Sequence, residues 1–290
     1  MLKRKLLFIL VLLSALSSCD KFDKPETRPA FLKIDKIDLQ TTSAQGSNSH
    51  KIVDAWVYID DMLIGVYSLP AKVPVVNTGV HDVKIRAGIK RNGIAVDRKP
   101  YPFYKPIKFT QELLSDSVYE LQPVVEYEDN IYMWVEDFED PGFKLYPYQS
   151  DTSMTRVSSP ASDLFEGSAG MIAMETENLV CEMRTNEPDF NAMPTNLSTP
   201  AYLEMNYRSN YPMEVGVLGK FSASEPYERV PLITLHSTNN QWNKTYLYLP
   251  DASNFLSGSP EFDIYFRVFN NTSSNGIKIY MDNLKVIFWN

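Results

Sequence analysis

The chain has 290 residues, with 28 Lys and Arg against 36 Asp and Glu, which gives a net charge of −8 at pH 7. An acidic chain of this kind has no electrostatic footprint for nucleic acid and no basic patch for anionic lipid headgroups, so we expect no nucleic-acid partner. The length allows two domains. With only two cysteines in the chain, stability must come from packed cores.

The first 19 residues have the pattern of a secretory signal. A basic head precedes an apolar run, residues 6–16, that is shorter than the roughly 20 residues a membrane span needs. Residues 16–19, Leu-Ser-Ser-Cys, resemble the lipobox of bacterial lipoproteins, in which the cysteine is lipidated and becomes the first residue. The resemblance implies acyl chains such as palmitate on Cys19 and a lipid anchor at the outer membrane. An ordinary cleaved signal peptide is the alternative. Lipidation of Cys19 would leave Cys181 without a disulfide partner.

Residues 19–30 are charged, carry two prolines and lack a hydrophobic pattern, so we expect a short extended tether. The acidic and lysine residues directly after the cysteine resemble the surface-export signal of Bacteroidetes lipoproteins. This pattern implies exposure on the cell surface, although the sequence also leaves a periplasmic orientation open.

Residues 31–127 predict a first domain made of β-strands. Val83 and Ile85 share one face while their charged neighbours share the other, which is typical of a half-solvated antiparallel strand. The dipeptide Asn92-Gly93 predicts a type I′ hairpin turn, because both positions of that turn require positive φ. The predicted strands are residues 31–39, 54–59, 62–67, 83–90, 94–98 and 118–125, with a polar loop over residues 41–49.

Residues 57–88 resemble the small β-sandwich repeats known as PEGA-like domains. The shared pattern is a strand, an acidic turn, a Gly-containing strand, a Pro-marked crossing and then Gly79-x-His81-x-Val83; the family's namesake motif is absent. The resemblance implies a PEGA-like or Ig-like sandwich that serves as a spacer or binding module without catalytic groups. It also implies a structural role for His81.

The aromatic segment over residues 101–106, Tyr-Pro-Phe-Tyr-Lys-Pro, has two interpretations. It could form an aromatic binding edge. Alternatively, its prolines protect an exposed edge strand from pairing with another chain.

Residues 130–290 predict a second domain, long enough to bury a core of its own. The short acidic junction before it predicts little flexibility between the domains. Residues 262–269 alternate between apolar and polar, as expected of a strand with one buried face. In the last strand, residues 277–289, the apolar positions change parity halfway. One extra residue is needed to place both sets on one face, so we predict a β-bulge near Asp282 and Asn283.

Five segments of the second domain together resemble the galactose-binding-like jelly roll of carbohydrate-binding modules: residues 137–142, 166–170, 202–207, 241–247 and 280–286. The resemblance implies a jelly roll that binds glycan. It also implies one structural calcium ion held by Glu139, Glu166 and Asp282, since calcium takes about 6–8 oxygen ligands, many of them from the backbone. The alternative is that these acidic side chains lie at strand ends in solvent and bind no metal ion.

Sugar binding requires aromatic rings that stack on pyranose rings, with amides and carboxylates nearby as hydrogen-bond partners. The loop tyrosines are the candidates for this role: Tyr146, Tyr148, Tyr207, Tyr211 and Tyr227. The three histidines lack the paired spacing of a zinc site, and no nucleophile elbow or Gly-rich phosphate loop is present.

The sequence therefore predicts an all-β protein of two β-sandwich domains, the second a jelly roll, behind a lipoprotein signal peptide. Non-catalytic binding of a polysaccharide at the cell envelope is the leading function. A structural or adhesion component that contacts another envelope protein is the first alternative. A jelly-roll glycan hydrolase is the second, and it would need two carboxyl groups facing each other across a cleft.

Overall fold

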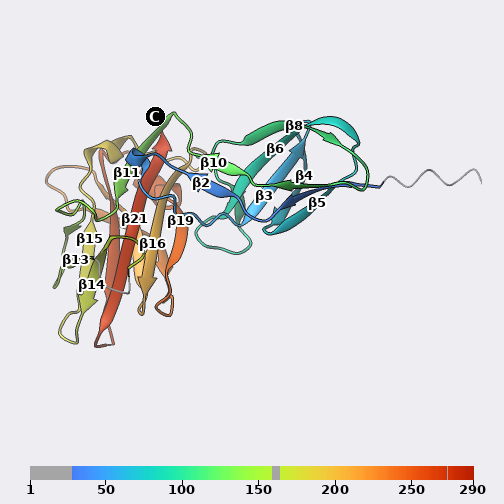
Figure 1. The fold of residues 1–290 in the computed structure, drawn as a ribbon. Helices are drawn as coiled ribbons and strands as arrows, with labels where there is room; N and C mark the ends of the chain where they lie inside the picture. The colour runs from blue at the N-terminus through green and yellow to red at the C-terminus, as the bar shows by residue number, and fades with distance from the viewer. Residues whose placement is uncertain (1–27, 159–163, 273) are drawn as a thin grey trace, which may run out of the picture.

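The computed structural model describes residues 28–158, 164–272 and 274–290, which form two β-sandwiches side by side (Figure 1). The predicted all-β class with two sandwich domains is therefore confirmed. The predicted lipidation site, Cys19, lies outside the described residues. In the described part of the chain, no helix has the length and apolar character needed to cross a membrane.

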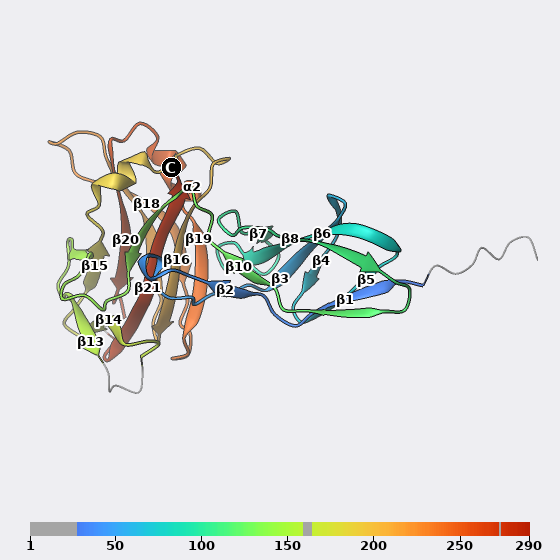
Figure 2. The ribbon, with the colours of Figure 1, turned by 45° about the horizontal axis from the view of Figure 1, so that its top comes forward.

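The first sandwich consists of two main sheets and a short parallel pair. One sheet has the strand order β5-β1-β9, and the other has the order β4-β3-β6-β7 with β8 also paired to β6. Leu32 and Val73 from the first sheet share a buried cluster with Val57 and Ile85 from the second. The parallel pair, β2 with β10, lies toward the second domain (Figure 2). The strands are β1 (Ala30–Ile34), β2 (Asp38–Gln40), β3 (Asp54–Ile59), β4 (Met62–Ser68), β5 (Ala71–Val75), β6 (Gly79–Lys90), β7 (Arg98–Pro100), β8 (Ile107–Leu113), β9 (Val118–Leu121) and β10 (Val124–Glu126).

Three predicted strands of this domain differ from the structure. The predicted strands over residues 31–39 and 118–125 are each split in two, because β1 pairs with β5 and β9, whereas β2 pairs with β10. Asn92 and Gly93 have the predicted positive φ values of 55° and 70°, but pairing with β6 resumes only at Arg98. Residues 94–97 form a loop instead, in which the N–H of Asp97 donates to the carbonyl of Ile94 at 3.2 Å.

The turn at Asn92 binds the second domain, which the hairpin prediction did not foresee. The Asn92 N–H donates to the Tyr246 carbonyl at 2.8 Å. The Asn92 side-chain oxygen accepts the Tyr248 N–H at 2.7 Å, and its amide nitrogen donates to Asp251 at 3.0 Å. A turn that would normally face solvent is therefore part of the domain junction.

The second sandwich packs two antiparallel sheets face to face. One has the order β13-β14-β21-β16-β19 with β11 also paired to β21, and the other has the order β12-β15-β20-β17-β18. Leu203 and Val286 from the first sheet share one buried cluster with Phe266 from the second. The strands are β11 (Ile131–Glu136), β12 (Tyr146–Pro147), β13 (Met154–Ser158), β14 (Ser168–Met174), β15 (Val180–Arg184), β16 (Ala201–Ser209), β17 (Met213–Lys220), β18 (Glu228–Leu235), β19 (Asn243–Tyr248), β20 (Glu261–Phe269) and β21 (Ile277–Trp289). The short helices of this domain are η2 (Pro188–Ala192), α2 (Pro250–Ser253) and η3 (Asn254–Leu256), and η1 (Ser43–Gln45) lies between β2 and β3 of the first domain.

The predicted bulge in the last strand is confirmed. Lys285 of β21 pairs with Glu204 of β16, and Asp282 pairs with Asn206, so β21 advances one residue more than its partner between these pairs. Asn283, inside the bulge, has a φ of 51°. The extra residue restores the parity of the strand, so the apolar residues on both sides of the bulge belong to the same core.

A buried cluster of aromatic rings joins the two sandwiches. The ring of Tyr101 lies 4.6 Å from Tyr104 and 5.1 Å from both Tyr202 and Tyr246 of the second domain, measured between ring centroids. Tyr127 continues the cluster on the other side of Tyr104, at 5.2 Å. Both interpretations of residues 101–106 are therefore wrong, because these aromatic residues are buried in the junction and do not form an exposed edge.

Candidate functional site

The outer face of the β12-β15-β20-β17-β18 sheet carries a group of charged side chains that are paired with one another. Side chains of a strand alternate between its two faces, and Met183, Val215 and Phe266 point into the core. The intervening positions therefore point outward. We call this surface the charged face; it consists of Glu182, Arg184, Glu214, Arg229, Asp263, Tyr265 and Arg267.

Ion pairs fix the centre of the charged face. The Glu182 carboxylate is fully buried between two arginines, with Arg229 at 2.8 Å from one oxygen and Arg267 at 3.1 Å from the other. The Tyr265 hydroxyl donates to Glu214 at 2.9 Å. Because each charged group is held by a partner, its orientation is set before any ligand arrives, which lowers the entropic cost of binding.

Tyr148, Arg184 and Tyr227 pack together at one end of the charged face. The two tyrosine rings meet edge to face with centroids 5.7 Å apart, and the Arg184 guanidinium lies 5.2 Å and 4.7 Å from them. Arg184 also donates to the Tyr227 hydroxyl at 2.9 Å and pairs with Asp263. Beside Tyr227 is a hollow of about 310 Å³ whose lining includes amides and carboxylates, Asn186, Glu187, Asn191, Glu261 and Asp263.

Two further predicted tyrosines lie at the same sheet. Tyr146 is on the edge strand β12 and is 48% exposed. Tyr211 precedes β17 and borders a second hollow, of about 210 Å³, together with Glu214 and Arg267. Four of the five predicted tyrosines are thus gathered around the charged face, at its two ends and one edge.

Tyr207 does not join them. It lies on β16 in the other sheet, and its ring packs in the core of the second sandwich, only 6% exposed. Its hydroxyl accepts a hydrogen bond from the Asn243 amide at 3.1 Å. Tyr207 therefore lies away from the charged face, in contrast to the other four tyrosines, and it borders the cleft of about 510 Å³ at the domain junction.

Sequence reasoning did not identify the arginines of the charged face. The signal was present in two strands: Glu182 and Arg184 alternate with Cys181 and Met183, and residues 262–269 alternate as predicted. Alternation shows which side chains of a strand point away from the core. It does not show that two arginines from different strands meet one carboxylate, because that depends on how the strands are ordered.

The three predicted calcium ligands lie around the bulge. Glu139 accepts the Ser168 N–H at 2.6 Å, and Glu166 accepts from the Asn283 amide at 3.2 Å. Asp282 is buried, and burial together with the charges of Glu166 and Glu139 raises its pKa to about 8. Within the described ranges, no three acidic, His or Cys side chains are placed to hold a metal ion. A calcium ion would need backbone and amide oxygens for most of its ligands, and its binding stays a prediction.

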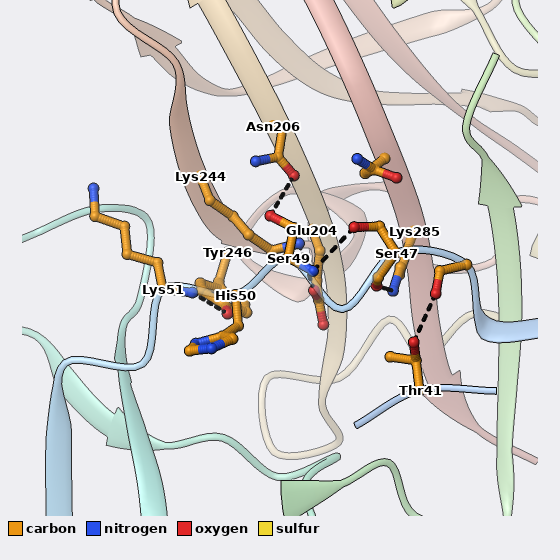
Figure 3. A network of polar contacts seen from close by, with 12 residues as sticks. Thr41, Ser47, Ser49, His50, Lys51, Glu204, Asn206, Lys244, Tyr246 and Lys285 are labelled. Atoms are coloured by element: carbon orange, nitrogen blue, oxygen red, sulfur yellow. Dashed lines mark hydrogen bonds and ion pairs between the residues drawn. The ribbon is translucent and has the colours of Figure 1, made fainter. Parts of the chain in front are cut away.

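A buried ion pair lies beside the aromatic cluster of the junction (Figure 3). The carboxylate of Glu204 on β16 is fully buried, and the ammonium of Lys244 on β19 is 3.1 Å from it. Tyr101 and Tyr127 of the first domain donate their hydroxyls to the same carboxylate at 2.8 Å and 3.0 Å. Glu204 is therefore held by both domains.

Residues 41–53, which we call the crossing segment, connect β2 to β3 by passing over the second sandwich (Figure 3). The segment contains the polar loop predicted over residues 41–49. Five hydrogen bonds join it to the second domain. Four are Ser47 Oγ to Glu166 (2.8 Å), Ser49 Oγ to Asn206 (3.0 Å), Lys51 N to the Tyr246 hydroxyl (2.9 Å) and Lys285 Nζ to the Ser47 carbonyl (2.6 Å), and in the fifth the Lys51 ammonium donates to the Asn243 side-chain oxygen. The loop is therefore fixed to the neighbouring domain.

We expect the junction to give the protein a characteristic pH dependence through Lys285. This side chain is fully buried, and burial lowers its pKa from 10.5 to about 8. Between about pH 8 and 10 the unfolded chain therefore binds a proton that the folded chain has lost, so the free energy of unfolding rises with pH. We expect a rise of about 1–2 kcal/mol between pH 8 and 9.5, measured by urea unfolding. The variant Lys285→Met should lose this rise; a rise of the same size in the variant would contradict the assignment.

No protein-family model matches the chain, and no curated protein matches it. Among solved structures, it is similar to a family 11 carbohydrate-binding module from Clostridium thermocellum in complex with a β-1,3-1,4-mixed-linked tetrasaccharide, with 15% identity, a TM-score of 0.34, and coverage of 53% of this chain and 94% of that one. It is also similar to a mutant family 29 carbohydrate-binding module complexed with mannohexaose, with 13% identity, a TM-score of 0.33, and coverage of 54% and 92%. A third structure, of a carbohydrate-binding module of the β-sandwich superfamily, has 13% identity and a TM-score of 0.37, and the match covers 81% of this chain and 84% of that one.

Proposed function

We propose that this protein is a non-catalytic glycan-binding protein that holds its ligand on the charged face of the second sandwich. The observation that supports the proposal is the group formed by Tyr148, Arg184 and Tyr227 next to a hollow of about 310 Å³. An aromatic ring beside amide and carboxylate groups is the combination that a sugar ring with many hydroxyl groups requires.

The surroundings of the tyrosines favour a carbohydrate with neutral rings at this position. The hollow beside Tyr227 is lined by the acids Glu187, Glu261 and Asp263, which accept hydrogen bonds from hydroxyl groups and repel anionic groups. Arg184 is already paired with Asp263, so it adds donors without adding net positive charge. We infer that hydroxyl groups, and not charges, are recognised here.

We further propose that acyl chains on Cys19 anchor the protein at the outer membrane, with the two sandwiches outside the bilayer. The support comes from the sequence, in which a basic head, an apolar run and small residues precede Cys19. More than one acyl chain buries enough methylene groups for stable attachment.

The proposed function predicts that Tyr227→Ala weakens glycan binding about tenfold or more, because a buried or half-buried aromatic anchor commonly contributes more than 1 kcal/mol. The ligand is first found by applying the purified chain, without residues 1–19, to an array of neutral glycans. Affinity is then measured by calorimetry.

A matched control is Tyr58→Ala, which removes another half-buried tyrosine ring beneath a lysine, in the first domain. This variant should bind like the unmodified chain. Retention of no neutral glycan on the array would contradict the proposal, as would equal affinities for the two variants.

A further inference from the structure

We propose that the cleft at the domain junction is a second binding site, for a short saccharide that carries anionic groups. The cleft has a volume of about 510 Å³, which is within the range of small-molecule sites. Its walls come from both domains: the crossing segment and the turn at Asn92 from the first, and the end of β18 with the start of β19 from the second. The saccharide class rests on the proposed function, whereas the charge is argued from the cleft itself.

The lining of the cleft is cationic in an acidic chain. It includes Lys51, Lys90 and Lys244, and no Asp or Glu is among the described residues that line it. Asp and Glu outnumber Lys and Arg by 36 to 28 over the whole chain. The charge of the cleft is therefore opposite in sign to the net charge of the protein. The field inside such a concave site attracts anions.

Two of these cations lack a counter-ion. The charge of Lys244 is balanced by Glu204 at 3.1 Å. Lys51 donates to the side-chain oxygen of Asn243, a neutral group, and neither Lys51 nor Lys90 forms an ion pair with any residue in the described ranges. Burial lowers the pKa of Lys51, and the positive charge of Lys90, which lines the same cleft, lowers it further. An anionic group bound in the cleft would offset both positive charges.

The rest of the lining suits the neutral part of a sugar. Amides and hydroxyl groups dominate it, namely Asn92, Thr234, Ser237, Thr238, Gln241 and Asn243. Trp242 and Tyr207 add aromatic side chains to the lining. Sugar hydroxyl groups both donate and accept, so they can satisfy these amides and hydroxyl groups, whereas an inorganic anion would leave most of them unused.

Anionic saccharides carry either uronate carboxylates or sulfate esters, and the two sources can be separated by experiment. The probes are a polygalacturonate oligosaccharide, the same oligosaccharide with its carboxylates methyl-esterified, and a sulfated galactan oligosaccharide. Binding to the chain without residues 1–19 is measured by calorimetry at low and at physiological ionic strength. We expect the free acid or the sulfated probe to bind and the methyl ester to bind at least about tenfold more weakly. We also expect the affinity to fall as salt is added.

The variant Lys51→Gln/Lys90→Gln should weaken binding of the anionic probe at least about tenfold. The matched control is Lys108→Gln/Lys278→Gln, which removes the same number of charges from exposed positions outside the cleft and should bind normally. Equal binding of the acid and its methyl ester would overturn the inference, as would equal affinities of the two double variants or the absence of binding by every anionic probe. A neutral glycan lost in Tyr227→Ala but kept in Lys51→Gln/Lys90→Gln would show that the charged face is functional even where the cleft proposal fails.

Discussion

Glu204→Ala is expected to lower the free energy of unfolding by about 3–5 kcal/mol, because removing one member of a buried ion pair leaves the other charge buried and unpaired. The Lys244 side chain, 3% exposed, would lose the counter-ion that it has among the residues the structure describes. The hydroxyls of Tyr101 and Tyr127 would lose their acceptor at the same time. Urea unfolding at pH 7, followed by tryptophan fluorescence, measures the change.

Two further variants separate the effect of charge from the effect of hydrogen bonding. Glu204→Gln retains an oxygen for the two tyrosines but removes the charge, so we expect a smaller loss. In Glu204→Leu/Lys244→Met both charges are absent, so the loss caused by the unpaired charge should disappear, whereas the loss from the two tyrosine hydroxyls without an acceptor should remain. A free energy of unfolding for Glu204→Ala that lies within about 1 kcal/mol of the value for the unmodified chain would contradict this account.

Tyr101→Ala should lower the free energy of unfolding by a similar amount, about 3–5 kcal/mol, which is the usual effect of truncating a large buried aromatic residue. Its ring contacts Tyr104 within the first domain and Tyr202 and Tyr246 in the second, so the cavity would open inside the junction. Urea unfolding measures the loss. Limited trypsin digestion at Lys51, in the crossing segment, should become faster as the junction loosens.

Tyr101→Phe is the control for this prediction. It retains the ring and loses only the hydrogen bond to Glu204 at 2.8 Å, so we expect a loss of about 1.5–3 kcal/mol, the range for a hydrogen bond to a charged group. If the alanine variant were no less stable than the phenylalanine variant, ring packing at the junction would contribute little, and the cluster would not be what holds the domains together.

Local patterns predicted several of the strands and an irregularity within one of them. The parity change between Met281 and Leu284 located the bulge, because a pleated strand places side chains on alternate faces whatever the rest of the fold does. The same rule correctly gave the two faces of residues 262–269. These features depend on neighbours along the chain, so one sequence contains them.

Contacts between distant segments could not be predicted in this way. Residues 101–106 contain the aromatic rings of the junction, but nothing nearby in the sequence indicates that Tyr202 and Tyr246 complete the cluster. Asn92 and Gly93 have the backbone of a hairpin turn, yet the side chain of Asn92 binds the second domain. A turn motif fixes local dihedral angles and says nothing about the surface against which the turn lies.

The candidate sites show the same division. Four of the five tyrosines chosen by residue type lie at one sheet. Tyr207 lies on the other sheet, at a strand position whose side chain points toward the core. The cationic cleft was not predicted at all, since Lys51 and Lys90 meet Gln241 only through the packing of two domains. Residue types suggest a chemistry, but three-dimensional proximity decides which groups can act together.

The crossing segment has a consequence for anyone who produces the two halves of this protein as separate recombinant fragments. A cut near residue 128 would leave the first fragment with a stretch, residues 41–53, that has lost the surface it rests on, and would expose Glu204, Tyr202 and Tyr246 to water on the second. Exposed aromatic surface of this kind promotes aggregation. Poor solubility of such fragments would therefore reflect where the chain was divided and would not indicate that either half lacks a defined fold.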